Sequence, residues 1–362
     1  MPEPLRTLVR HVLVACAIAA AATLARGQDV HFTQFYASPM LLNPALAGAF
    51  DGQLRASMIY RDQNRGVLPS PFTTISAALD FRFPVAIGGR DQGDAAAAGI
   101  VFFNDRVSEY DYSHNQIMLN GAYHKMLDKR TNQILSGGVA LGIGQRNVNF
   151  TDLDFQDEFS IRPNGTSGYF GATREEFPPN NITFFDVNAG VNYSYAPRGR
   201  AGFYVGAAAH HVNEPDVSFF SRETDAVESE TATPLRRKYS LHAASVLPLS
   251  STLSLQPRAL AQLQGQHAQA VLGANVRMQA DEFSSFALHL GSWVRGVRDL
   301  DAAGVDAVVA LVGIEYGNVL LGASYDVGVS DFTAGDRGRG ALEISLAYLG
   351  SYENDALLCP QF

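Results

Sequence analysis

The feature that most constrains this chain is a two-residue alternation of apolar and polar side chains that runs through long segments. In residues 184–197, FFDVNAGVNYSYAP, one side of an extended chain carries Asp186, Asn188 and Asn192, and the other side is mostly apolar. About fourteen such segments of roughly nine to twelve residues follow one another from residue 54 onward, without a convincing amphipathic helix between them. The pattern predicts an all-β fold.

Strand length separates two interpretations of this pattern. Strands of soluble β-sandwiches most often have about five or six residues, whereas a tilted strand needs about ten to cross a bilayer. A spanning sheet must close on itself, because an open edge in lipid leaves backbone groups unpaired. We therefore predict that residues 51–362 form a transmembrane antiparallel β-barrel of about 14 strands, within a range of about 12 to 16, in the outer membrane. A soluble sandwich is the alternative.

In a barrel of this kind the polar side of each strand faces the lumen, because the other side contacts lipid. The predicted strands place several charged or amide side chains on that polar side. We expect the lumen to be lined by residues that include Asp186, Asn188, Asn192, His289, Asp326 and Glu343.

The first 27 residues have the organisation of a secretory signal peptide. Basic residues precede an apolar, alanine-rich stretch at 12–24, and residues 25–27, Ala-Arg-Gly, place small side chains where a signal peptidase reads them. A lipoprotein signal ending at Cys16 is the competing interpretation, but its apolar stretch would be about four residues against the usual 7–15 or so. Beyond residue 27 there is no run of about 18 apolar residues, which excludes ordinary transmembrane helices. We expect an exported chain that begins near Gln28.

Residues 28–50 are apolar but too irregular to form a spanning strand, because Pro39 and Pro44 interrupt regular structure. An apolar segment outside the barrel wall must be buried inside the barrel or against another molecule. We predict a periplasmic-end plug or a docking segment, with simple packing at the barrel base as the alternative. The residues expected to make these contacts are Phe32, Phe35, Tyr36, Leu42, Asn43 and Pro44.

Net charge argues against nucleic acid as a partner. The whole chain has 27 Lys and Arg and 36 Asp and Glu, and removal of residues 1–27 takes away three of the former and one of the latter, which leaves about −11. An acidic chain without a basic stripe binds nucleic acid poorly. Cys359 is the only cysteine after residue 27, so no intramolecular disulfide and no cysteine metal site are expected.

No catalytic pattern stands out in the sequence. It lacks a G-x-S-x-G elbow, an H-E-x-x-H pair and a Walker glycine loop. His210 and His211 are adjacent, so on a strand they would point to opposite faces and could not share a metal ion. A group of loop acids could converge on calcium, but it lacks the glycine of an EF-hand and is better explained as solvated. Those acids are Asp152, Asp154, Asp157 and Glu158. We expect no enzyme activity, no cofactor and no metal.

Three glycines alternate on one predicted strand, at Gly138, Gly142 and Gly144. A phosphate-binding loop is one interpretation, but strand glycines more often mark places where another backbone or side chain comes close. We predict that they make room for a plug or for close packing at the wall.

Several stretches together resemble the PorP/SprF family of outer-membrane proteins of the type IX secretion system. The first is the opening QDVHFTQFYASPMLLNPALAGAF at residues 28–50, and the second is FDVNAG at 185–190. His211 with Pro215 resembles a third block, and YDVGVS at 325–330 followed by LEISL at 342–346 resembles the C-terminal pair of strands. The ending CPQF at 359–362 is similar to the usual close of the family, whereas the length of the loop at 147–181 departs from its pattern. The match covers essentially the whole chain after residue 27.

The resemblance implies a non-enzymatic component of the secretion machinery. Members of the family support export or surface anchoring of large proteins, including adhesins used in gliding, that carry a C-terminal sorting domain. The implied partners are that cargo, a periplasmic peptidoglycan-binding component of the secretion system, and outer-membrane lipid. An outer-membrane solute channel of porin or hydrophobic-compound type is the alternative, and it would not need the apolar segment at 28–50.

Overall fold

The structure is a computed structural model that describes residues 29–66, 68, 70–87, 90–107, 112–130, 132–150, 153, 155–161, 166–169, 173–175, 177–197, 199–219, 233–298, 303–329 and 340–350. Its internal contacts divide the chain into two units, Met1–His31 and Phe32–Phe362. Every described helix and strand belongs to the second unit. The predicted signal peptide, the calcium alternative at Asp152 and Asp154, and Cys359 lie outside the described residues or include residues outside them.

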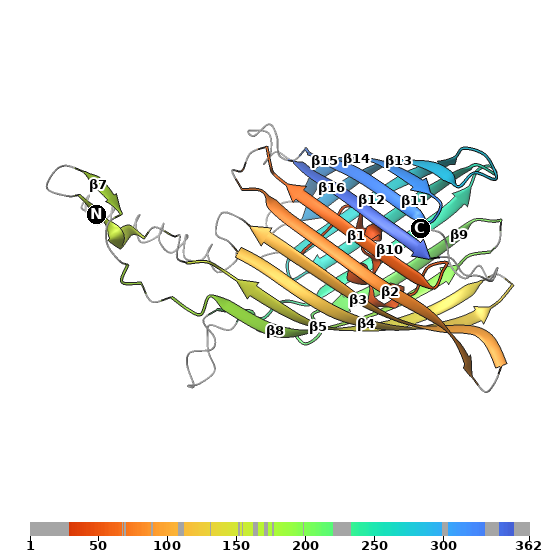
Figure 1. Ribbon diagram of the computed structural model, residues 1–362, viewed down its shortest axis with the longest axis horizontal. Coiled ribbons are helices and arrows are strands. Elements are labelled where there is room, and N and C mark those ends of the chain that lie inside the picture. The colour runs from red at the N-terminus through yellow and green to blue at the C-terminus, as the bar shows by residue number, and fades with distance from the viewer. Residues whose placement is uncertain are drawn as a thin grey trace, which may run out of the picture. The chain divides into compact units, whose positions relative to one another are not determined.

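Within the described residues, fourteen strands form one closed antiparallel barrel, which confirms the predicted fold (Figure 1). They are β1 (Leu54–Gln63), β2 (Phe72–Ile87), β3 (Arg90–Val107), β4 (Tyr112–Asp128), β5 (Gln133–Asn147), β8 (Asn181–Tyr195), β9 (Gly202–His210), β10 (Lys238–Pro248), β11 (Leu253–Gln264), β12 (His267–Gln279), β13 (Phe286–Arg298), β14 (Ala303–Tyr316), β15 (Val319–Gly328) and β16 (Gly340–Gly350). Each strand pairs with its neighbours in chain order, and β1 pairs with β16 to close the barrel. A separate two-stranded sheet of β6 (Phe159–Ile161) and β7 (Ser167–Tyr169) lies in the connection between β5 and β8.

β2, β3 and β4 have 16, 18 and 17 residues, so they are longer than the strands of roughly nine to twelve residues that the alternation predicted. The reason is local. β2 continues past the first residue of β1 and pairs there with β3, which also pairs with β4 as far as Ala95. In this region Pro84 and the alanine run at 95–98 hide the two-residue period.

The barrel has the polarity of a membrane protein, with apolar side chains outside and polar ones inside. Leu119 and Ile143 point outward and are each 63% exposed, whereas Asp186 and Glu343 point inward and are 0% exposed. In water this outer surface would be unfavourable, whereas in a bilayer it contacts acyl chains.

The two ends of the barrel differ in the length of their connections. The end where β1 begins and β16 stops has short turns, whereas the opposite end carries the long connections at 148–180 and 211–237. Bacterial barrels have short periplasmic turns and longer extracellular loops. The end with the long connections is therefore assigned to the cell exterior.

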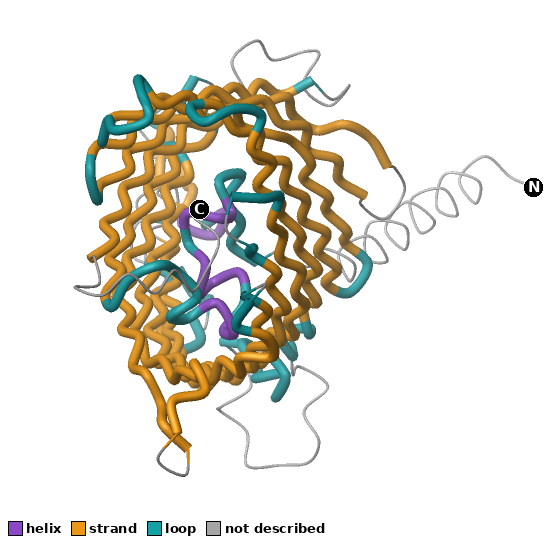
Figure 2. The backbone as a smooth tube through the Cα atoms, turned by 90° about the vertical axis from the view of Figure 1, so that its right-hand side faces the viewer, coloured by secondary structure: helices purple, strands orange, loops and turns teal. Residues whose placement is uncertain are grey.

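Residues 32–50, here called the lumen segment, lie inside the ring of strands (Figure 2). The segment consists of three short helices, η1 (Phe35–Ala37), α2 (Pro39–Leu42) and η2 (Pro44–Leu46). No helix in the described part of the chain is both long and apolar enough to cross a membrane. Thr33 contacts the wall near the outer end of β1, and Gly48 contacts it near the periplasmic end, so the segment descends along the lumen.

Candidate functional site in the barrel lumen

The outer end of the lumen segment is held by a buried carboxylate of the wall. The backbone N–H groups of Thr33 and Gln34 donate to the two carboxylate oxygens of Glu343, at 2.7 and 2.8 Å. The Gln34 amide nitrogen donates to Ser324 Oγ at 2.9 Å, and Ser345 Oγ donates to the Gln34 amide oxygen at 2.7 Å. Both the main chain and the side chain of Gln34 are therefore recognised by β15 and β16.

Two arginines neutralise the acids at this end. Arg61 on β1 forms ion pairs with Glu343 on β16 and Asp326 on β15. Arg295 on β13 lies 2.6 Å from the same Asp326 oxygen. The Thr33 hydroxyl donates to Asp326 at 2.8 Å and accepts from Arg295, also at 2.8 Å. Buried charges are stable only when they are paired and hydrogen-bonded, and the lumen segment supplies part of that bonding here.

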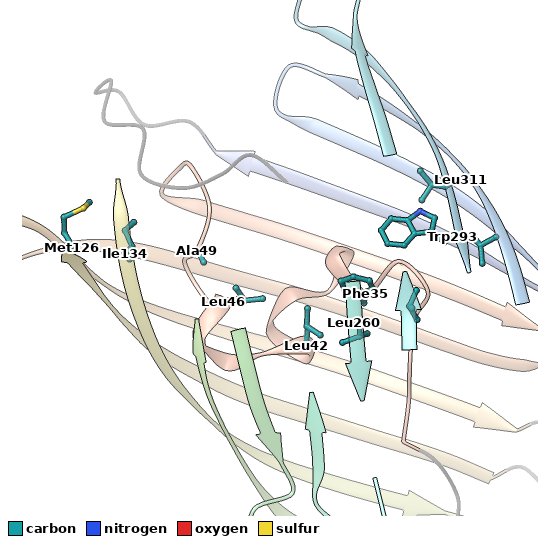
Figure 3. Close-up of a cluster of buried hydrophobic side chains, with 11 residues drawn as sticks. Phe35, Leu42, Leu46, Ala49, Met126, Ile134, Leu260, Trp293 and Leu311 are labelled. Atoms are coloured by element: carbon teal, nitrogen blue, oxygen red, sulfur yellow. The ribbon is translucent and has the colours of Figure 1, made fainter. Parts of the chain in front are cut away.

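Next along the segment, two aromatic side chains pack on the single tryptophan of the protein. Figure 3 shows the first of them, Phe35, in the same buried cluster as Trp293. Phe35 meets Trp293 edge-on with ring centroids 5.8 Å apart, and Tyr36 stacks on the same indole at 5.7 Å. The Arg258 guanidinium lies 4.0 Å from the centroid of the Tyr36 ring, which is the geometry of a cation–π contact. Burial raises the pKa of the Tyr36 hydroxyl above its ordinary value, and the positive charge of Arg258 opposes that shift.

The middle of the segment turns at Asn43 and Pro44. The Asn43 side-chain oxygen accepts from the Ala45 N–H at 2.9 Å and caps η2, and Pro44 occupies the first position of that short helix. The Asn43 amide nitrogen donates to the Val191 carbonyl at 2.9 Å and lies 3.1 Å from His242 Nε2. One side chain therefore fixes the turn and attaches it to the wall.

The periplasmic end of the segment is held through its backbone. The Gly48 N–H donates to Asp80 Oδ2 at 2.7 Å, and Arg82 donates to the Gly48 carbonyl at 2.9 Å. His124 Nε2 lies 2.8 Å from the Ala47 carbonyl. Gly48 has a φ of +69°, a conformation that suits glycine and that precedes the chain's entry into β1.

Wall glycines make room for the segment at four places. A Cβ atom at Gly138 would lie 2.5 Å from backbone atoms of Pro44 and Ala45. At Gly190 it would lie 2.0 Å from the Asn43 amide oxygen. A Cβ atom at Gly99 would likewise lie too close to the Met40 side chain, and one at Gly322 too close to the Gln34 side chain. The prediction that strand glycines admit a plug or close packing is confirmed. Gly138 admits the segment, whereas Gly142 and Gly144 admit neighbouring side chains of the wall.

The structure distributes the predicted lumen residues over different contacts. Asp326 and Glu343 bind the outer end of the segment, whereas His289 pairs with Glu315 within the wall. Asp186 lies 2.9 Å from His211 Nδ1, and Asn188 accepts from the His211 N–H at 2.9 Å. Asn192 is buried beside Gly206. The six lumen-segment candidates are all buried or half-buried: Phe32, Phe35, Tyr36, Leu42, Asn43 and Pro44.

The expectation that His210 and His211 point to opposite faces is wrong. β9 ends at His210, and His211 adopts a φ of +55°, so the strand alternation stops between them. Both side chains are buried, and their ring centroids are 6.4 Å apart. Among the described residues no cluster of three metal-binding side chains occurs.

The predicted site residues did not include several groups that make these contacts, namely Thr33, Gln34, Trp293 and the wall arginines. A signal for the wall groups exists in the sequence, because Arg61, Trp293 and Arg295 fall on the predicted polar side of their strands. A charged residue inside a spanning segment needs a partner in the interior. The sequence does not identify that partner.

Across the middle of the barrel, the described inward-facing residues of every strand are buried or half-buried. A water-filled passage would leave its lining exposed, as in porins. The lumen is instead packed from wall to segment. Its geometry is suited to binding a polypeptide chain through hydrogen bonds, ion pairs and shape.

A family model described as type IX secretion system membrane protein PorP/SprF matches residues 24–348. No curated protein matches the chain. Among solved structures, a monoaromatic hydrocarbon channel, CymD, has 11% identity and a TM-score of 0.49, over 91% of this chain and 96% of that one.

Two further solved structures are similar at the same level. A FadL homologue from Pseudomonas aeruginosa has 12% identity and a TM-score of 0.47, covering 84% of this chain and 92% of that one. CdiB from Escherichia coli has 9% identity and a TM-score of 0.46, covering 81% and 63%. At these values no functional conclusion follows from the three structures.

Proposed function

This chain belongs to the PorP/SprF family of type IX secretion system membrane proteins, and from that premise we propose that it supports export or surface anchoring of large cargo proteins. The cargo would carry a C-terminal sorting domain, and adhesins used in gliding are one class of it. The barrel anchors the assembly in the outer membrane, and recognition, without enzyme activity, is its contribution. A peptidoglycan-binding secretion component would be its periplasmic partner.

The packed lumen is the observation that carries this proposal. A lumen filled by a segment with specific contacts from the outer to the periplasmic end leaves little room for passive solute flow. It also leaves the outer connections and the periplasmic end as surfaces for other proteins. Both properties favour a binding component over a pore.

Charge supports a partner of opposite sign. The chain after residue 27 carries about −11, and like-charged surfaces repel at short range. A basic surface on the cargo or on the periplasmic partner would speed their encounter, and this effect weakens as salt rises.

The proposal is tested in the native host by deletion of the gene for this chain. Proteins with a C-terminal sorting domain are then quantified in the surface and culture-medium fractions. We expect at least one to be lost from the surface and restored by the wild-type gene. A tagged copy purified from the outer membrane should retain the same protein. Normal surface levels of all such proteins in the deletion strain would overturn the proposal.

The solute-channel alternative is measured on the same purified barrel. Reconstituted into planar bilayers or vesicles, the wild-type chain should show no stable conductance and no uptake of small apolar compounds. Steady conductance combined with normal cargo display would favour a channel instead.

A further inference from the structure

The ladder between β1 and β16, here called the seam, differs from every other ladder of the barrel in how the chain connects it. All other neighbouring strands are consecutive barrel strands joined by a turn or loop. At the seam, Arg61 pairs with Glu343 in register, although 282 residues separate them in sequence. The entropy lost on closing a loop grows with its length. The seam is therefore the ladder whose formation loses the most chain entropy.

Glu343 lies at this seam as a fully buried carboxylate, and Arg61 from the opposing strand is its ionic partner. The Arg61 guanidinium contacts Oε1 of this carboxylate, and both oxygens of a buried acid need hydrogen-bond donors. The remaining donors are the consecutive N–H groups of Thr33 and Gln34. The lumen segment therefore completes the hydrogen bonding of the ion pair that crosses the seam.

The same dipeptide spans both sides of the seam. The Thr33 hydroxyl lies 3.3 Å from Arg61 on β1 and 2.8 Å from Asp326 on β15. The Gln34 amide bonds Ser324 on β15 and Ser345 on β16. These contacts tie β1 to the last two strands through a third piece of chain, in addition to the backbone ladder.

The wall leaves space for this dipeptide. A Cβ atom at Gly322 would lie 2.9 Å from the Gln34 amide oxygen and 2.6 Å from Ser345 Oγ, so only glycine leaves space for the amide. Gln34 and Thr33 are 1% and 2% exposed. The site binds two successive main-chain N–H groups, a threonine hydroxyl and a glutamine amide, and the two N–H groups converge on one carboxylate because the chain bends at Thr33 and Gln34.

We propose that the inner face of the seam is a peptide-binding site, that Thr33–Gln34 is its resident ligand, and that this binding holds the barrel closed. The inference does not depend on the role in secretion. Its physical basis is that the seam is the ladder with the largest closure entropy and that the dipeptide bonds both of its sides. Removal of the dipeptide's side-chain contacts should loosen the seam more than any other ladder.

The test combines a double substitution with a disulfide placed at the seam. In a Cys359→Ser background, Thr33→Val with Gln34→Ala removes the hydroxyl and amide bonds and leaves the rest of the segment in place. Heat-induced unfolding is followed by gel mobility in detergent and by the fluorescence of Trp293. We expect the unfolding temperature to fall by about 5 °C or more.

Ser57 and Ala347 are paired residues of β1 and β16, and Gln262 and Gln269 are paired residues of β11 and β12. Paired Cα atoms in antiparallel strands are within reach of a disulfide. The Ser57→Cys with Ala347→Cys bridge should restore more than half of the lost stability in the double variant. The Gln262→Cys with Gln269→Cys bridge should restore much less.

Leu42→Ala serves as the packing control, because it weakens the segment away from the seam. The stability lost in Leu42→Ala should be restored equally by the seam disulfide and by the disulfide between β11 and β12. Equal rescue of the Thr33→Val, Gln34→Ala variant by both bridges would overturn the proposal. Failure of that variant to fold even with the seam bridge would overturn it as well, because the bridge supplies the closure that the dipeptide is proposed to provide.

Discussion

The two parts of the lumen segment are held by different kinds of interaction. At Thr33 and Gln34 the wall presents two acids and two arginines, and the contact depends on charge and on hydrogen-bond donors. At Asn43 and Pro44 the wall presents Gly190 and Gly138, and the contact depends mainly on the absence of a side chain there, in addition to the hydrogen bonds of the Asn43 amide. The first part is therefore held mainly by charge and hydrogen bonds, and the second mainly by shape, through close packing against glycines.

This difference suggests a division of labour along the segment. Charge-assisted hydrogen bonds are directional and lie at the seam, where two distant parts of the chain must find a single register. Close backbone packing is insensitive to charge and lies against β5 and β8, which a loop already connects. Each kind of contact should therefore be weakened by a different substitution.

The largest effect is expected from Glu343→Ala, which removes the acid and leaves Arg61 buried without its main partner. Loss of one member of a buried ion pair costs about 3–5 kcal/mol of unfolding free energy. The change would be measured by urea unfolding of the barrel in lipid vesicles, with Trp293 as the fluorescent reporter. The backbone N–H groups of Thr33 and Gln34 would lose their acceptor in the same step.

Glu315→Ala is the matched control for this prediction. Glu315 also pairs with an arginine, Arg277, and with His289, but the Glu315 and Arg277 side chains are 25% and 18% exposed and all three groups belong to the wall. We expect a loss of about 1 kcal/mol, as for partly exposed pairs. Equal losses for the two glutamates would show that the seam contact has no special weight.

The next largest effect tests the part selected by shape. Gly138→Val would place side-chain atoms against the backbone of Pro44 and Ala45, which cannot move aside as a flexible side chain can. Overpacking of this kind costs about 1–3 kcal/mol. It should also shift the emission of Trp293, because displacement of the segment exposes that indole.

Gly137→Val on the same strand is its control. A Cβ atom at Gly137 meets nothing within 4 Å, because that position faces outward. Its effect on unfolding should stay within about 0.5 kcal/mol. A large loss at both glycines would indicate a general intolerance of β5 to valine and would remove the distinction between charge and shape.

The wall of this barrel was predictable from the sequence, and the reason is periodicity. The lipid-facing side of a strand is selected for apolar residues along its whole length, so Leu119, Leu141 and Ile143 give a repeated signal. The lumen side is selected residue by residue. Asp186 and Glu343 could be assigned to it, but their partners could not, because the partners come from parts of the chain distant in sequence.

The lumen segment was only partly predictable from the sequence. Its apolar residues and two prolines indicate a buried, irregular segment, and the structure places Phe35 and Leu42 in a buried cluster. Thr33 and Gln34 carry no such pattern, because their contacts with Glu343 use backbone N–H groups that every residue except proline possesses. The predicted direction of the His211 side chain was wrong for a related reason. A single positive φ at His211 ends the strand alternation, and no glycine in the sequence marks that position.

A smaller effect isolates one shape contact by a double-mutant cycle. Gly190→Ala alone would bring a methyl group against the Asn43 amide, and Asn43→Ala alone would remove the cap on Ala45 and the bond to Val191. In the double variant the clash is absent, so the two losses should not add. We expect a coupling of about 1 kcal/mol in urea unfolding. Simple additivity would mean that Asn43 and Gly190 are not in contact.

The smallest effect is expected from Tyr36, which lies between the two parts of the segment. Ionisation of its hydroxyl should lower folding stability at alkaline pH. Burial raises the pKa of its hydroxyl above the ordinary 10.0, and the Arg258 charge opposes the shift without reversing it. Well below pH 10 the hydroxyl is protonated in both the folded and the unfolded chain, and its contribution is constant. Above that pH the unfolded chain releases the proton first, so folding stability falls as pH rises toward the folded pKa.

Tyr36→Phe removes this proton and keeps the ring on Trp293. Between pH 9 and pH 11 its unfolding temperature should therefore fall less than that of the wild type, while other tyrosines and lysines contribute equally to both. At pH 8 the two proteins should differ only slightly, because the bond between Asn275 and the Tyr36 hydroxyl is long, at 3.4 Å. The same alkaline loss in both would mean that Tyr36 ionises freely when folded. In that case the aromatic contact would be open to water and the segment would be held by its two parts alone.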